Sequence, residues 1–168
     1  MADSYLNLGL VAAHEGDYAA AGHWYEQSQL LYQAIGEKRG LADIQHHLGM
    51  LALLRGDAAA AEELFRDCLT TRQAMTNRAG MIATLSGLAA VLAERTAMQV
   101  TASRLLGAVQ AALGQSYVWL DALDRQMMAQ TQARLVTDMG EEAFAAACEA
   151  GRLLTLAEAV GEVGRLRD

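Results

Sequence analysis

The sequence predicts an all-α fold, a solenoid of stacked helical hairpins closed by a C-terminal helical cap. The first observation is an internal repeat, in which Leu8-Gly9 recurs as Leu48-Gly49 and Gly16-Asp17 recurs as Gly56-Asp57. Self-similarity at a fixed period, here about 40 residues, is typical of helical repeats, because each hairpin buries its apolar face against the next one. The second observation is composition: the chain is 53% hydrophobic and contains no proline, and glycine falls at regular intervals.

The first hairpin is defined by apolar side chains at helical spacing. They predict a helix over residues 3–15, which Gly16 ends. Asp17 is placed to cap the second helix, whose apolar stripe at offsets of three and four runs over residues 18–35. Gly36 breaks that helix.

The second and third hairpins follow the same pattern. The second has helices expected at residues 39–55 and 58–76, with Gly56-Asp57 between them. The third has helices expected at residues 78–94 and 99–113. Its turn lacks the Gly-Asp pair, and one residue is inserted there.

The end of the chain does not match the repeat. Helices are expected at residues 119–139, 141–150 and 156–166, each preceded or followed by glycine or a cap. Thr155 with Glu158 three residues later predicts a capping box for the last of them. We expect these helices to cover the open end of the solenoid.

All of these elements are expected to form one domain. Residues 1–114 supply three hairpins, at about 3–36, 37–77 and 78–114, and residues 115–168 supply the capping helices.

Charge restricts the classes of partner. The net charge is −7, the pI is about 5.0, and Lys38 is the only lysine. Without a cluster of basic side chains the chain is not expected to bind nucleic acid or an anionic membrane surface. No apolar run reaches membrane-spanning length and the first residues do not resemble a secretory signal, so a cytoplasmic location is expected.

No residue pattern indicates catalysis, a metal or a cofactor. Cys68 and Cys148 lie within apolar helical patterns and are expected to be buried thiols. His46 and His47 are adjacent on a helix, about 100° apart, and cannot easily bind one ion. We expect the histidines to be solvated or to line a groove. An unrecognised enzyme is the remaining alternative.

The repeat resembles the tetratricopeptide repeat. Its landmarks are a Leu-Gly pair, a Gly-Asp pair, an alanine and an aromatic residue. The spacing from Leu8 to Tyr25 is the same as that from Leu48 to Phe65, and it equals the spacing of the family's motif. The usual period is about 34 residues, so this is a longer variant. The resemblance implies a right-handed α-solenoid that serves as a protein–protein interaction module.

The 40-residue variant is similar to the solenoid of bacterial LuxR-type and AfsR-type transcriptional regulators and signalling ATPases. Residues 102–108, 140–144 and 151–160 also resemble the C-terminus of such signalling ATPases. The resemblance implies a C-terminal sensor or oligomerisation part, or a relative that stands alone. A solenoid that senses a small-molecule effector is the alternative within the same family.

The resemblance also implies a concave face lined by the first helix of each hairpin. The family's groove positions fall on Leu6, Leu10, His14, His46, Met50, Leu53, Leu54, Ser86 and Ala90. Because this face is apolar, we expect it to bind a protein or peptide. The alternative is that the longer helices curl tightly and bury some of these side chains.

A homodimer through the first hairpin is also expected. No capping helix precedes this hairpin, so Leu6 and Leu10 are expected to be open to solvent and to be covered by a second copy across a two-fold axis. The alternative is that further repeats normally cover this end.

Overall fold

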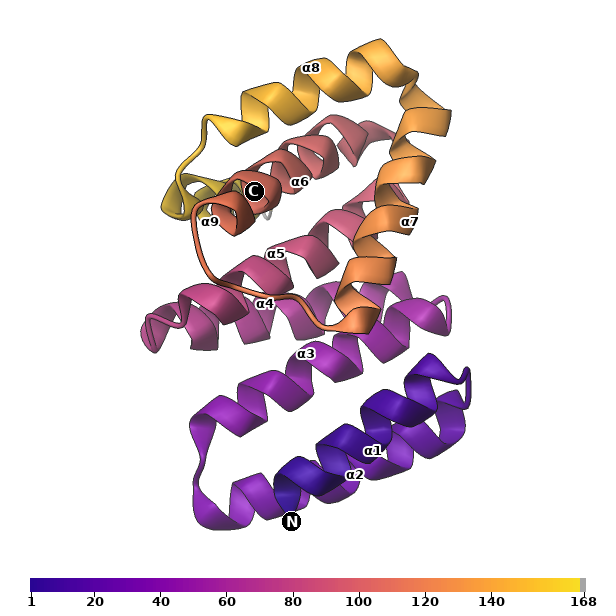
Figure 1. Cartoon of the computed structure of the whole chain (residues 1–168), viewed down its shortest axis with the longest axis vertical. Coiled ribbons are helices and arrows are strands. Elements are labelled where there is room, and N and C mark those ends of the chain that lie inside the picture. Colours follow the sequence, from indigo (N-terminus) through magenta and orange to yellow (C-terminus); the bar gives the residue numbers. More distant parts are fainter. Residues whose placement is uncertain (167–168) are drawn as a thin grey trace. The chain divides into compact units, whose positions relative to one another are not determined.

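The computed structural model describes residues 1–166, and this part of the chain contains nine α-helices, one short 3-10 helix and no strand (Figure 1). The predicted all-α fold of helical hairpins is confirmed. The chain divides into two compact units, Met1–Gly80 and Met81–Asp168. The division groups most of the third predicted hairpin with the C-terminal helices.

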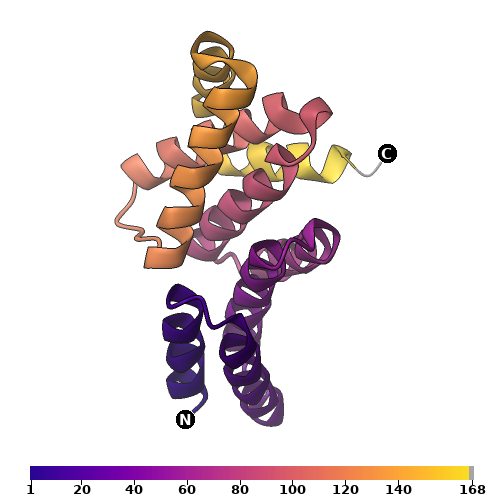
Figure 2. The ribbon, with the colours of Figure 1, turned by 90° about the vertical axis from the view of Figure 1, so that its right-hand side faces the viewer.

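Unit 1 consists of two helical hairpins. Its helices are α1 (Ala2–His14), α2 (Tyr18–Ile35), α3 (Lys38–Leu54) and α4 (Ala58–Ala74). Helix α1 packs on α2 and α3 packs on α4, and the two hairpins stack through a contact between α2 and α3 (Figure 2). Every end of these four helices lies within two residues of the predicted one.

The turns inside the two hairpins are built alike. Gly16 and Gly56 have φ angles of 83° and 82°, a conformation that glycine adopts without strain. The Asp17 and Asp57 carboxylates cap α2 and α4, and each accepts a hydrogen bond from the backbone N–H three residues later, at 2.9 and 3.0 Å. The Gly-Asp pairs therefore end one helix and start the next, as predicted.

The core of unit 1 repeats its contacts from one hairpin to the next. The Tyr25 ring lies over Gly9, and the Phe65 ring lies over Gly49 so closely that a Cβ there would stand 2.8 Å from it. Both rings are fully buried. The Leu-Gly landmark thus marks the point where the first helix of a hairpin lets the aromatic ring of the second approach its backbone.

Polar contacts follow the same repeat. The Ser28 hydroxyl donates a hydrogen bond to the Ala2 carbonyl at 2.8 Å, and the Cys68 thiol donates one to the Ala42 carbonyl at 3.2 Å. These bonds join the two helices of each hairpin near the N-terminus of the first.

A second pair of equivalent contacts involves charge. The Tyr32 hydroxyl donates a hydrogen bond to Asp3, and at the equivalent place Arg72 forms an ion pair with Asp43 at 2.8 Å. The two hairpins therefore share one geometry while using different chemistry at this position.

Unit 2 is organised around α6. Helix α5 (Arg78–Ala93) begins at the unit boundary, and a short 3-10 helix (Thr96–Met98) leads from it to α6 (Gln99–Gly114). The remaining helices are α7 (Ala122–Met139), α8 (Glu141–Arg152) and α9 (Leu156–Arg165). All three contact α6, and α8 does so most extensively (Figure 1).

Two details of unit 2 differ from the prediction. Helix α7 begins three residues later than expected, because the Asp121 carboxylate caps it by accepting a hydrogen bond from the Asp124 N–H at 2.8 Å. Helix α8 does not end before Gly151. Gly151 and Gly107 instead let the backbones of α8 and α6 touch, since a Cβ at either position would collide with a main-chain carbonyl of the other helix.

The capping box at the start of α9 is confirmed, with both of its reciprocal hydrogen bonds between Thr155 and Glu158. Within residues 1–166, no helix is both long enough and apolar enough to cross a membrane.

Candidate interaction surface

The nine side chains predicted to form the concave face differ in exposure. His46, Met50, Ser86 and Ala90 are buried, Leu6, Leu10, Leu53 and Leu54 are half-buried, and His14 is exposed. The four buried side chains offer a partner little surface. Within unit 1 the accessible members are the four leucines and His14, and binding by this face remains a prediction.

The two adjacent histidines are buried in the core of unit 1, which corrects the expectation that they are solvated or line a groove. The His47 ring stacks on Tyr25 with centroids 5.7 Å apart, and the His46 ring lies 5.5 Å from that of Phe65. Both histidines are on α3, which α2 and α4 contact from two sides. Helix α3 therefore has a wider buried surface than the apolar stripe indicates.

The two cysteines lie inside the helical packing. Cys68 and Cys148 are buried, as predicted, and neither is in a disulfide. Burial raises the pKa of the Cys148 thiol, which disfavours its reactive thiolate. In the part of the chain that the structure describes, no three His, Cys, Asp or Glu side chains are grouped to hold a metal ion.

A further apolar surface, which the sequence pattern does not predict, lies on α1. Leu8 is 44% exposed and Val11 is 55% exposed. The equivalent of Val11 in the second hairpin, Leu51, is 2% exposed, and the equivalents in the third, Leu88 and Val91, are fully buried. Leu48, the equivalent of Leu8 in the second hairpin, is half-buried. This face of the first helix is therefore less exposed in the later hairpins than in the first.

The second hairpin shows what covers this face. The side chains of Leu51 and Arg55 lie against Gly22 of α2, 3.6 and 3.2 Å from the position that its Cβ would take. Arg55 also donates a hydrogen bond to the Tyr18 carbonyl at the start of α2. The face is thus suited to contact with another helix.

This face of α1 carries a line of exposed side chains that ends one residue after the helix, and we call it the α1 stripe: Ser4, Leu8, Val11 and Glu15. Asn7 and His14, which are also exposed, lie beside it. Helix α1 contacts α2 and, less extensively, α3, so its remaining side is uncovered within unit 1 (Figure 2). The spacing of four, three and four residues is that of one helical face. In the sequence pattern Leu8 is a landmark of the repeat, and nothing in that pattern distinguishes its exposure from that of Leu48.

Residues 1–74 match the tetratricopeptide repeat family. The match spans both hairpins of unit 1, from α1 to the end of α4. Tetratricopeptide repeats generally mediate protein–protein interaction, which supports that class of function here. No curated protein and no solved structure gives a significant match to the chain.

Beyond the tetratricopeptide match, unit 2 also exposes large apolar side chains. Tyr117 and Trp119 are almost fully exposed in the segment between α6 and α7, and Leu153 is exposed between α8 and α9. Leu120, next to Trp119, is buried and anchors the segment. Tyrosine and tryptophan are enriched at protein interfaces, so this segment is a second candidate contact.

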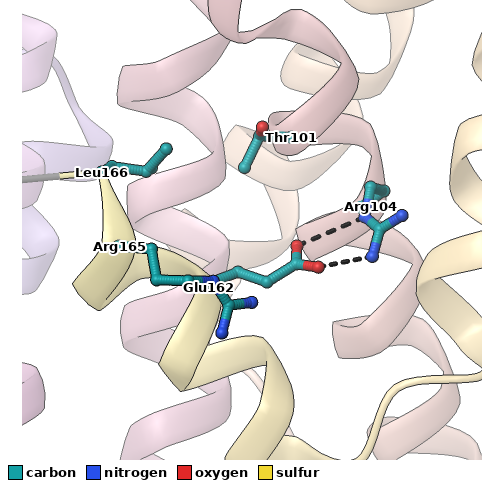
Figure 3. A pocket seen from close by; sticks show the side chains of 5 residues that line it. All are labelled: Thr101, Arg104, Glu162, Arg165 and Leu166. Carbon is teal, nitrogen blue, oxygen red and sulfur yellow. Dashed lines mark hydrogen bonds and ion pairs between the residues drawn. The ribbon is translucent and has the colours of Figure 1, made fainter. Parts of the chain in front are cut away.

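A small pocket of about 180 Å³ lies between α6 and α9 (Figure 3). It is lined by Thr101, Arg104, Glu162, Arg165 and Leu166. Glu162 accepts two hydrogen bonds from Arg104, and this pairing raises the pKa of Arg104. The pocket is smaller than the roughly 300–1,000 Å³ of usual ligand sites, and its carboxylate is already paired. It does not favour the small-molecule effector alternative.

Proposed function

We propose that this chain is a non-catalytic protein–protein interaction module, and that it is the C-terminal part, or a relative, of a bacterial LuxR-type or AfsR-type regulator or signalling ATPase. The observation that carries the proposal is the tetratricopeptide match over residues 1–74, folded as two stacked hairpins. Stacked repeats present extended surfaces for binding other proteins. The long period of the repeat and the tail segments support the regulator context.

The proposed partner is a protein or peptide with apolar side chains. The four half-buried leucines of α1 and α3 provide the contact surface, with His14 at its edge. The net charge of −7 supports a partner other than nucleic acid. Regulators of this class act in the cytoplasm, where we place the chain.

Site-specific photo-crosslinking in living bacterial cells tests the proposal. A photoreactive residue at Leu10 or Leu53 should form a discrete protein adduct. The matched control is Leu30, which is 59% exposed on α2 and outside the predicted face. Leu54→Glu should remove the adduct at Leu53, because it places a charge within the apolar contact. Identical adducts from Leu30 would contradict the proposal.

A further inference from the structure

We infer that the α1 stripe is a self-association site, on which α1 of a second copy packs in antiparallel orientation. The inference rests on the proposed function and names one protein partner. Its first support is the repeat itself, since Leu51 and Val91, the residues equivalent to Val11, are buried in the later hairpins, and Leu51 lies against Gly22 of α2. Covering an apolar face of this kind with a helix lowers the free energy, because apolar surface is removed from water.

The spacing of the stripe is self-complementary. Ser4, Leu8, Val11 and Glu15 follow one another at intervals of four, three and four residues, and this pattern reads the same in both directions. A two-fold axis through the middle of the stripe therefore places Leu8 opposite the second copy's Val11, twice. The same axis places Ser4 opposite the second copy's Glu15. Isologous contacts of this type close a dimer.

Charge favours the antiparallel orientation. The first turn of α1 has no side-chain cap, in contrast to α2 and α4. Its backbone N–H groups carry partial positive charge. The exposed Glu15 carboxylate of a second copy reaches this turn only in an antiparallel pair. A parallel pair instead brings the two Glu15 carboxylates together.

The acidic residue of the same turn does not oppose this contact. Asp3 accepts a hydrogen bond from the Tyr32 hydroxyl of α2, so its carboxylate is directed to the side of α1 that packs within the hairpin. Ser4, the next residue, belongs to the exposed stripe.

A preceding hairpin of the α2 type suits this face less well. At the position equivalent to Glu15, the residue that follows α3 is Arg55, which donates a hydrogen bond to the Tyr18 carbonyl of the covering helix. Glu15 carries the opposite charge and cannot donate that bond. The charge reversal is the reason for assigning the site to a second copy.

The dimer is expected to be weak. Helix α1 has 13 residues, which is about 20 Å at 1.5 Å per residue. One such helix pair buries less than the roughly 1,200–2,000 Å² of stable interfaces. The dissociation constant is therefore expected in the range of about 10–100 μM.

Sedimentation equilibrium from about 1 to 300 μM covers that range. The wild-type chain should follow a monomer–dimer equilibrium, and Val11→Glu should raise the dissociation constant at least about tenfold. The control Leu30→Glu adds the same charge at an exposed leucine of α2 and should leave association unchanged. Both variants should melt like the wild type, because both positions are exposed. A wild-type monomer throughout, or equal effects of both changes, would overturn the inference.

Disulfide cross-linking tests the register. The native thiols are buried, so an introduced cysteine reports alone. Leu8→Cys mixed with Val11→Cys should give a mixed disulfide across the axis, whereas Leu8→Cys mixed with Leu30→Cys should not. Equal yields from the two mixtures would rule out the stripe as the contact.

The self-association site and the partner-binding face can be refuted independently of each other. Val11→Glu should retain the photo-crosslinked adduct at Leu53, because Leu53 is on α3. If association is absent and this adduct persists, only the self-association site is wrong. If association is present and neither Leu10 nor Leu53 gives an adduct, the partner-binding face is wrong.

Discussion

Phe65 shows how much unit 1 depends on one side chain. Its ring is fully buried over Gly49 and beside His46. Phe65→Ala is expected to lower the free energy of unfolding by about 3–5 kcal/mol, because it leaves a cavity that the surrounding helices fill only in part. Urea denaturation measures the loss, with Leu30→Ala as the exposed control. A loss below about 1 kcal/mol would place the ring outside the core.

Tyr32 makes the stability of unit 1 depend on pH in the alkaline range. Burial, and then the hydrogen bond to Asp3, raise the pKa of its hydroxyl. The folded-state pKa lies above the unfolded value of about 10, so the stabilisation is fully present below about pH 10 and is lost as the pH rises further. Urea denaturation at about pH 9 and pH 11 should show a smaller decline in stability for Tyr32→Phe than for the wild type. Equal declines in the wild type and in Tyr32→Phe would show that Tyr32 does not cause the loss of stability at alkaline pH.

At the scale of the element, the turns between helices are set by single glycines. Gly56→Ala is expected to cost about 1–2 kcal/mol, because φ at this position is 82°. The control is Gly114→Ala at the end of α6, where no atom lies within 4 Å of the added Cβ and φ is not positive. That change should be neutral or stabilise by up to about 1 kcal/mol. Thermal melting compares the stabilities of the two variants. Equal changes in melting temperature would contradict the inference that the positive φ at position 56 requires glycine.

Glycine within a helix has a different role. Gly107 and Gly151 lie inside α6 and α8, where they let the two backbones approach. The sequence pattern predicts a helix over residues 141–150 that ends before Gly151. A glycine at a turn and one at a helix–helix contact look alike in sequence, because both are defined by the absence of a side chain. The neighbouring helix decides which role applies.

At the scale of the whole molecule, the prediction of a single domain is testable by amide hydrogen exchange. If units 1 and 2 fold cooperatively, the slowest amides of α3 and α6 share one opening free energy. Phe65→Ala, in unit 1, should then lower protection in both helices by the same amount. Protection lost in α3 and retained in α6 would show that the units unfold independently.

Self-association and partner binding also belong to this scale. The α1 stripe lies on a different side of α1 from Leu6 and Leu10. The other two concave leucines are on α3, so the proposed dimer leaves them available to another protein.

The sequence determined the hairpins of unit 1. The repeat period, the Gly-Asp turns and their caps are local signals, and local signals fix where a helix begins and ends. The same is true of the capping box at Thr155 and Glu158. Packing partners recur at the same period, so the aromatic rings over Gly9 and Gly49 also follow from the repeat.

Tertiary structure alone decided which apolar side chains are exposed. Leu8 and Leu48 occupy the same place in the pattern, as do Val11 and Leu51, yet Val11 is 55% exposed and Leu51 is 2% exposed. The repeat gives both hairpins the same face, and in residues 1–166 α2 of the first hairpin packs against α3 of the second. Exposure depends on a neighbour that lies outside the repeat unit. For that reason the sequence pattern predicted Leu6 and Leu10 to be open to solvent, whereas the structure exposes Leu8 and Val11.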